Sequence, residues 1–124
     1  MKRISAAESL VMEALWQKSP ITAEEVTAEV AAAQAWSEAT VKTLLNRLLK
    51  KKAIAAKKDG RRYLYRPLIA RDAYVQSESQ GLLDRLFDGR LAPLVSHFSE
   101  QGRLSPQDLA ELRRLIEELD DEPR

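Results

Sequence analysis

Two stretches of the chain decide its fold: WSEATVKTLLNRLLKKK at residues 36–52 and KKDGRRYLYRP at residues 57–67. On a helical wheel of about 100° per residue, the first stretch separates into an apolar side and a polar side. The apolar side collects Val41, Leu44, Leu45, Leu48 and Leu49, and the polar side collects Ala39, Lys42, Thr43, Asn46, Arg47 and Lys50. The second stretch places Asp59 and Gly60 between two strand-forming runs. It therefore predicts a β-hairpin with these two residues as its turn.

Two shorter helices are predicted before this one. The first runs from about Ser5 to Ser19, and Pro20 ends it. The second begins with Thr22 as N-cap and has Glu25 three residues later, which is the spacing of a capping box. Three short helices with brief connections are typical of a helix-turn-helix domain.

The third helix and the hairpin complete a winged helix over residues 1–70. Ser37 is expected to cap this helix at its N-terminus. A lone hairpin is only marginally stable in water. We therefore expect this one to pack on the helices through Ile54, Tyr63 and Tyr65.

Residues 71–124 are predicted to form three more helices and a dimerisation domain. This segment contains more leucines than one small three-helix unit can bury, which indicates that a second copy of the chain covers the remainder. The last helix has a short coiled-coil spacing, although packing within one subunit would give the same pattern. The residues with this spacing are Leu109, Leu112, Ile116 and Leu119. The predicted fold is mainly α with a small β-hairpin wing: a winged helix-turn-helix followed by a C-terminal helical dimerisation domain.

Charge is distributed unevenly along the chain, although the net charge of its 124 residues is only +1. Residues 1–70 contain 13 Lys and Arg against 7 Asp and Glu, whereas residues 71–124 contain 7 against 12. Residues 37–66 alone contain ten basic residues and two acids, Glu38 and Asp59. Such a concentration of positive charge favours a polyanionic partner.

The polar side of the third helix and the hairpin tip fit double-stranded DNA. Hydroxyl, amide and cationic side chains can contact base edges in the major groove, and cations at a hairpin tip can bind phosphates. We assign phosphate binding to Lys50, Lys51, Lys57, Lys58, Arg61 and Arg62. We assign sequence readout to Thr40, Lys42, Thr43 and Asn46, and place Ser37 and Arg47 at the same interface. In a dimer, two wings on a twofold axis would read two half-sites.

Other classes of function find less support in the sequence. His97 is the only histidine, there is no cysteine, and no phosphate-binding glycine loop or nucleophile motif occurs. We therefore expect no metal, no cofactor and no enzymatic activity. No run approaches the ~20 apolar residues that span a membrane, and we expect a cytoplasmic protein that is neither exported nor inserted. Three alternatives stay open: a winged helix that binds an acidic protein, a non-specific DNA-packaging protein, and a basic surface that only confers solubility.

The order of motifs along the chain resembles the penicillinase-repressor family of bacterial transcription regulators, the BlaI and MecI type. Four segments, spread along nearly the whole chain, carry the resemblance: ISAAESLVMEALW, WSEATVKTLLNRLLKKKAI, KKDGRRYLYRPL and LVSHFSEQGRLSPQDLAELRRLI. The resemblance implies a cytoplasmic homodimer that represses β-lactam-resistance or related genes from palindromic promoter DNA. It also implies derepression when a membrane sensor-protease pathway leads to cleavage in the dimerisation domain.

Some positions depart from the family's pattern. The bond cleaved in the best-known members joins asparagine to phenylalanine, whereas the matching bond here joins His97 to Phe98. Lys52 stands where relatives commonly have glycine, and because a left-handed lysine would cost about 1 kcal/mol, we expect the third helix to end differently. Glu38 and Ala39 stand where some relatives have proline and lysine, so the resemblance does not imply the operator sequence. Copper-responsive relatives carry cysteines, and their lack here argues against copper sensing.

Overall fold

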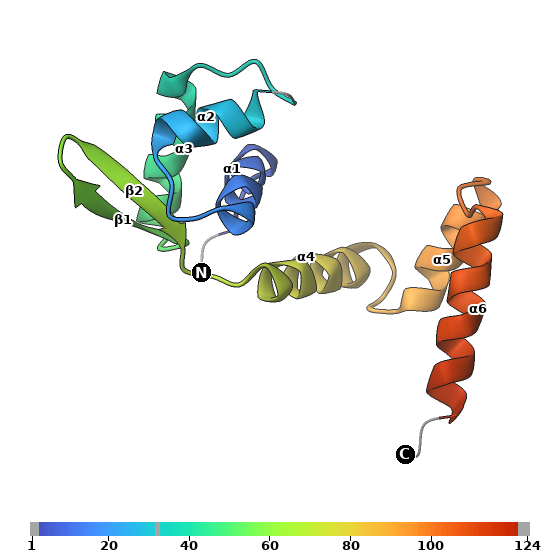
Figure 1. Ribbon diagram of the computed structural model, residues 1–124. Helices are drawn as coiled ribbons and strands as arrows, with labels where there is room; N and C mark the ends of the chain where they lie inside the picture. The colour runs from blue at the N-terminus through green and yellow to red at the C-terminus, as the bar shows by residue number, and fades with distance from the viewer. Residues whose placement is uncertain (1–2, 32, 122–124) are drawn as a thin grey trace. The chain divides into compact units, whose positions relative to one another are not determined.

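The computed structural model describes residues 3–31 and 33–121, which form six helices and one two-stranded antiparallel sheet (Figure 1). The chain divides into two compact units, Met1–Val75 and Gln76–Arg124. The break falls within α4 (Arg71–Leu86), a few residues after the domain boundary expected from the sequence. The predicted fold class, mainly α with one small β-hairpin, is confirmed.

The first unit begins with two capped helices. Ser5 caps α1 (Ala6–Gln17), and Thr22 caps α2 (Ala23–Val30) in the predicted capping box with Glu25. The Thr22 backbone N–H and hydroxyl both donate to Glu25 Oε1 at 3.1 Å. These two hydrogen bonds lower the pKa of Glu25. Both helix starts are therefore fixed by local hydrogen bonds that the sequence spacing encodes.

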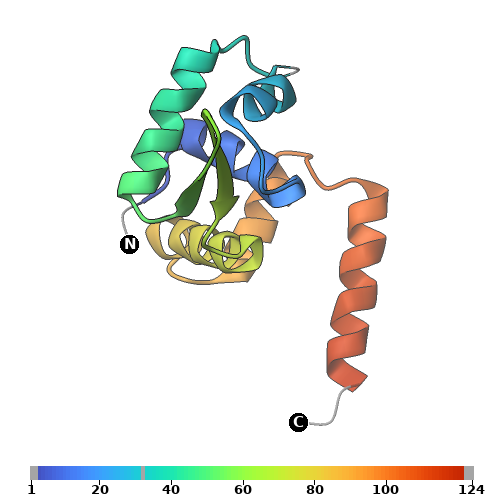
Figure 2. The ribbon, with the colours of Figure 1, turned by 60° about the vertical axis from the view of Figure 1, so that its left-hand side comes forward.

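The third helix, α3 (Glu38–Lys50), has one side in the core of the first unit and the other side uncovered. In Figure 2, α1 and the hairpin lie on one side of α3, and its other side is open. Ser37 Oγ accepts a hydrogen bond from the Thr40 backbone N–H at 3.2 Å, which is the predicted cap. The core residues that α3 contributes are Val41, Leu44, Leu45 and Leu48, and Leu49 is half-buried beside them.

The end of α3 corrects one expectation. Lys52 adopts the left-handed conformation with φ 62°, at the position where we expected the helix to end differently. The backbone N–H of Lys52 donates to Leu49 O, and that of Ala53 donates to Leu48 O, both at 3.0 Å. These two bonds form a Schellman motif, which satisfies carbonyls that the helix end would leave free. The motif therefore holds a lysine in a conformation that glycine adopts without strain.

Replacing Lys52 with glycine should stabilise the first unit. We expect Lys52→Gly to raise the free energy of unfolding by about 1 kcal/mol, because the left-handed strain is removed. Urea denaturation at neutral pH measures the change. Lys50→Gly is the matched control: it removes the same side chain from inside α3 and should lower stability by about 1 kcal/mol. A loss of stability in Lys52→Gly would contradict this account.

The hairpin consists of β1 (Ile54–Asp59) and β2 (Arg62–Pro67). Asp59 pairs with Arg62, so the two-residue turn is Gly60–Arg61 and not Asp59–Gly60 as predicted. Gly60 has φ 65°, and Arg61 is not among the positive-φ residues. Positive φ at the first turn residue alone is the pattern of a type II′ turn, which requires glycine at that position. The prediction was wrong by one residue because Asp-Gly also fits a type I′ turn.

The hairpin base, not its tip, is attached to the helices. Ile54 and Tyr65 are buried as predicted, and Ile21 exchanges backbone hydrogen bonds with Tyr65 at 3.1 and 2.8 Å. Burial raises the pKa of Tyr65, with a further contribution from Tyr63. Tyr63 is 50% exposed, so its predicted packing role is wrong. It lies on the same face as Tyr65 but two residues nearer the tip, which extends beyond the helices in Figure 1.

The second unit contains most of α4 and the helices α5 (Leu91–Glu100) and α6 (Pro106–Asp121), close to the three predicted helices. Ser105 lies directly before α6 and caps its N-terminus. Its hydroxyl oxygen accepts from the Asp108 backbone N–H at 3.0 Å, and Asp108 Oδ2 accepts from the Ser105 N–H at 3.3 Å. None of the described residues of these three helices is fully buried.

Candidate nucleic-acid interface

The outer side of α3 is a largely polar surface. All seven residues of this outer face are exposed; six of them are the predicted polar side, and Thr40 joins them. The face consists of Ala39, Thr40, Lys42, Thr43, Asn46, Arg47 and Lys50. Across the described residues, the side chains of Asn46, Arg47 and Lys50 have neither a hydrogen bond nor an ion pair. Their amide and cationic groups are therefore available to a partner.

Hydroxyl groups at the start of α3 are engaged within the helix. Ser37 Oγ lies 3.2 Å from Thr40 Oγ1, in addition to capping the Thr40 N–H. Thr43 Oγ1 donates to the carbonyl of Ala39 at 3.1 Å. Lys42 Nζ lies 3.6 Å from Glu38 Oε1 across one turn, and both side chains are well exposed. An exposed ion pair of this kind contributes only a fraction of a kcal/mol, so Lys42 can exchange Glu38 for another anion at little cost.

Lys51 does not belong with the other predicted phosphate-binding residues. Its Nζ donates to the backbone carbonyl of Arg3 at 2.8 Å and forms an ion pair with Glu8 Oε1. Glu8 is only 1% exposed, and its Oε1 also accepts from the Ser5 N–H at 2.9 Å. Binding phosphate would leave the Glu8 carboxylate buried without its cation, which is costly. We therefore leave Lys51 out of the proposed interface.

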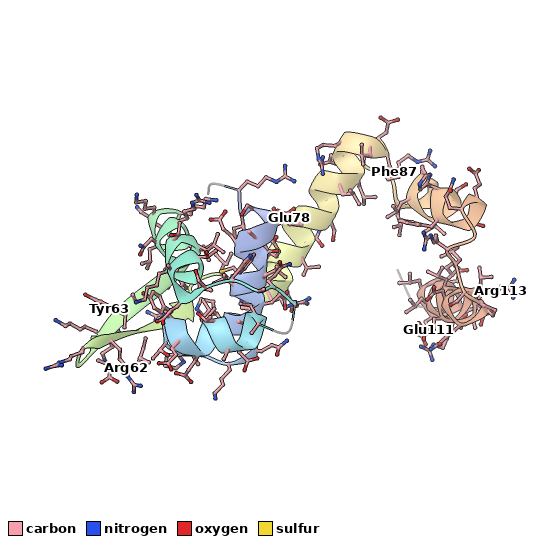
Figure 3. The ribbon with its side chains drawn as sticks, turned by 90° about the horizontal axis from the view of Figure 1, so that it is seen from above. Arg62, Tyr63, Glu78, Phe87, Glu111 and Arg113 are labelled. Carbon is pink, nitrogen blue, oxygen red and sulfur yellow. The ribbon has the colours of Figure 1, made fainter. Side chains whose placement is uncertain are left out.

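The hairpin tip carries the predicted concentration of cations. Lys57, Lys58, Arg61 and Arg62 are all exposed around the Gly60–Arg61 turn. Arg62 binds Asp59 on the opposite strand, with its Nη2 3.2 Å and its Nε 3.3 Å from Asp59 Oδ2. Figure 3 shows Arg62 and Tyr63 projecting from this end of the hairpin. The tip can therefore offer several cations to a polyanion at once.

A polar cleft of about 360 Å³ separates the hairpin tip from the start of α2 and α3. Arg61, Arg62 and Tyr63 line it from the hairpin, and Glu24, Glu38 and Lys42 are among the residues that line it from the helices. Tyr63 was not assigned to this surface from the sequence. Because Tyr63 is two residues from Tyr65 in a strand, the sequence predicts that both lie on the same face of the hairpin. It does not predict that the helices cover Tyr65 and leave Tyr63 exposed.

The second unit exposes apolar side chains. A groove of about 290 Å³ between α5 and α6 is lined mostly by apolar residues, which include Leu94, Val95, Phe98, Leu104, Leu112 and Leu115. The four residues with the predicted coiled-coil spacing are called the seam below. Of these, Leu112 is half-buried, whereas Leu109, Ile116 and Leu119 are exposed. His97 and Phe98 lie within α5, and their ring centroids are 5.6 Å apart. Within residues 3–31 and 33–121, no cluster of three His, Cys, Asp or Glu could hold a metal, and no helix could cross a membrane.

The sequence of the chain is similar to those of two known repressors or regulators of antibiotic resistance. The chain is 37% identical to a penicillinase repressor of Bacillus licheniformis over 116 residues, covering 94% of this chain and 91% of that protein. It is 32% identical to the methicillin resistance regulatory protein MecI of Mammaliicoccus sciuri, covering 91% and 92% of the two chains.

Two solved structures resemble a part of the chain. One is the DNA-binding domain of the repressor BlaI, which is 40% identical with a TM-score of 0.52 and covers 60% of this chain and 94% of that one. The other is the monomeric form of Bacillus licheniformis BlaI in complex with the blaP half-operator, also 40% identical, with a TM-score of 0.51, covering 59% and 89%. The model of the penicillinase repressor family matches residues 4–118. The chain therefore belongs to the penicillinase repressor family.

Proposed function

We propose that this chain is a homodimeric, sequence-specific DNA-binding repressor in which α3 enters the major groove and the hairpin tip binds the phosphate backbone. The observation that carries the proposal is the outer face of α3, which is exposed, polar and free of packing, next to four exposed cations at the hairpin tip. A related repressor, BlaI, forms a complex with half-operator DNA and is 40% identical over this part of the chain. We further propose that the regulated genes serve β-lactam resistance or a related response.

Residues assigned to DNA divide into two sets. Thr40, Lys42, Thr43 and Asn46, with Ser37 at the start of the helix, face the bases in this proposal. Arg47, Lys50, Lys57, Lys58, Arg61 and Arg62 bind phosphates. Phosphate contacts fix position without reading sequence, and base contacts supply the discrimination. The charge of the hairpin tip would then be neutralised by the DNA, which accounts for so many cations around one turn.

Selection of duplexes from a random pool with the full chain tests the proposal. We expect one enriched sequence with two related half-sites, and an affinity that falls steeply with salt because bound cations release counterions from DNA. Fluorescence anisotropy on the selected duplex at several salt concentrations measures the slope. Salt-dependent binding without an enriched sequence would favour non-specific packaging of DNA. No binding to any duplex would favour a winged helix that binds an acidic protein.

We propose that the second unit joins two copies of the chain. The support is the exposed apolar surface of α6, where Ile116 is 57% and Leu119 is 63% exposed in the single chain. Single exposed leucines are normal, but several along one helix face favour a partner surface. A second copy would cover these residues and pair the two wings about a twofold axis, which suits a palindromic operator.

Ile116→Glu should convert the dimer to a monomer without unfolding the chain. Ile116 is mostly exposed within its own chain, so the charge costs little there, whereas it would be buried between two copies. Light scattering over a range of protein concentrations measures the mass. Ala110→Glu adds the same charge on the far side of α6 and should remain dimeric. A dimeric Ile116→Glu protein would show that the seam lies elsewhere.

We propose that repression is relieved by cleavage between His97 and Phe98 through a sensor-protease pathway. Both residues are exposed, but the bond lies inside α5, and the carbonyls of His97 and Phe98 accept hydrogen bonds from Gln101 and Arg103 at 3.2 and 2.9 Å. Cleavage would remove α6 and its seam, and the loss of bivalent binding would lower affinity for the operator. In cells exposed to a β-lactam, mass spectrometry should find a fragment ending at His97. Derepression with the chain intact would contradict this switch.

A further inference from the structure

The hydroxyl group of Thr43 is already used within α3. Its O–H donates to the backbone carbonyl of Ala39, with 3.1 Å between the two oxygens, while the residue itself is exposed on the outer face. A threonine hydroxyl has one hydrogen, so this bond leaves no hydrogen to donate to a base edge. The Cγ2 methyl group is the other end of the side chain, and it is the group that remains free to meet a partner.

Ala39 places a second methyl group beside the first. Residues four apart on a helix have Cβ atoms about 5–6 Å from each other. Ala39 is exposed, and Ala39 and Thr43 thus form an apolar step on a face that is otherwise polar and cationic. Asn46 lies one turn further along the same face, and its amide has no partner within the described residues. A longer side chain at position 39 would cover this step.

We propose that Ala39 and Thr43 together recognise the 5-methyl group of a thymine in the major groove. The inference rests on the proposed function, in which α3 enters that groove. Thymine is the base that presents a methyl group there, and apolar contact with alanine or a threonine methyl is a recurring way to read it. Thr43 is therefore a specificity residue through its methyl group, and its hydroxyl holds the side chain in position. Ala39 is a specificity residue because its methyl group extends the apolar contact and its small size leaves the Thr43 methyl group uncovered.

Deoxyuridine substitution isolates the methyl group on the DNA side. In the selected duplex, each thymine is replaced in turn by deoxyuridine, which lacks only the 5-methyl group. We expect one position in each half-site at which the wild-type chain loses affinity by about fourfold, the scale of burying one methyl-sized group. At that position, the difference in affinity between the thymine and deoxyuridine duplexes should disappear when the Thr43 methyl group is also removed.

Two conservative variants separate the methyl group of Thr43 from its hydroxyl. Thr43→Ser keeps the hydroxyl and removes the methyl group, and it should bind thymine and deoxyuridine duplexes equally. Thr43→Val keeps the methyl group and removes the hydroxyl, and it should still prefer thymine. Ala39→Gly should reduce the preference, with circular dichroism verifying that α3 remains folded.

The outcomes are distinguishable from failure of the proposed function. Enrichment of a sequence, with no thymine sensitive to deoxyuridine, overturns this inference alone. A preference for thymine that survives in Thr43→Ser and vanishes in Thr43→Val would show that the hydroxyl reads the base, which also overturns it. If selection enriches no sequence, the proposed function fails and this inference fails with it.

Discussion

Replacing Arg61 and Arg62 with alanine is expected to weaken binding to every duplex by a similar factor. Each bound phosphate adds about 0.9 to the salt slope, which amounts to roughly 1 kcal/mol near physiological salt. Removing two phosphate-binding arginines from each protomer should therefore cost roughly 2 kcal/mol, or about thirtyfold, per half-site. The slope of log affinity against log salt should become shallower by about 0.9 for each phosphate that the variant no longer binds. Anisotropy titrations on selected and unrelated duplexes measure both quantities.

Two control variants make this result specific. Arg85→Ala with Arg90→Ala removes the same charge from exposed arginines outside the hairpin and α3, and should leave the slope unchanged. Asn46→Ala should give the opposite pattern, with less discrimination between duplexes and an unchanged slope, because its amide is assigned to a base. If the double arginine variant kept both its affinity and its slope, the hairpin tip would have no contact with phosphates.

Replacing Lys51 with methionine is expected to destabilise the first unit by about 3 to 5 kcal/mol, because the buried Glu8 carboxylate loses its cation. The hydrogen bond from Ser5 would remain, but the charge would have no counterion. Urea denaturation followed by circular dichroism measures the change. A loss below about 1 kcal/mol would show that Glu8 takes up a proton or reaches water when Lys51 is removed.

The pH dependence of stability should also change in the same variant. Burial raises the pKa of Glu8, but in the wild type the hydrogen bonds from Lys51 and Ser5 outweigh burial and the net pKa is lowered. A carboxyl whose pKa is lower in the folded state contributes stability above its ordinary pKa and loses it as pH falls through the lowered value. Without Lys51, burial is opposed only by the hydrogen bonds from Ser5, so the pKa of Glu8 should rise above its wild-type value. The variant should therefore recover stability relative to the wild type as pH falls towards the ordinary pKa of glutamate.

The double variant Glu8→Met, Lys51→Met is the matched control. Replacing both members of a buried ion pair with apolar residues is often neutral or stabilising, whereas removing one member is not. The double variant should thus regain most of the stability lost in Lys51→Met. The part not regained, about 1 kcal/mol, belongs to the capping box between Ser5 and Glu8. If the double variant were as unstable as Lys51→Met, the stability lost in Lys51→Met would come from altered side-chain packing and not from the unpaired charge of Glu8.

Local patterns in the sequence were sufficient for most of the fold. The partition of α3 followed from helical periodicity, and the caps at Thr22 and Ser37 followed from spacing within four residues. The hairpin followed from one Asp-Gly step. Each of these features depends on neighbours in the chain, which is why a single sequence can encode them visibly.

The features that were missed depend on partners distant in sequence or on bonds that compete with local preference. Lys51 looks like any other cation of a basic run, and its partner Glu8 lies 43 residues away. Lys52 is left-handed because the bonds of the Schellman motif outweigh the strain. Tyr63 lies on the predicted face of the hairpin, but it lies beyond the part of the hairpin that the helices cover and is exposed. For the candidate interface, periodicity could therefore predict which residues are exposed, but not which cations are already bound inside the chain.

At the hairpin tip, Asp59 would compete with a DNA phosphate for the Arg62 guanidinium. To bind a phosphate, Arg62 has to break its ion pair with Asp59. Because both side chains are exposed, this ion pair is weak enough to exchange readily. In the proposed complex, breaking this ion pair would offset part of the free energy that Arg62 gains from a phosphate.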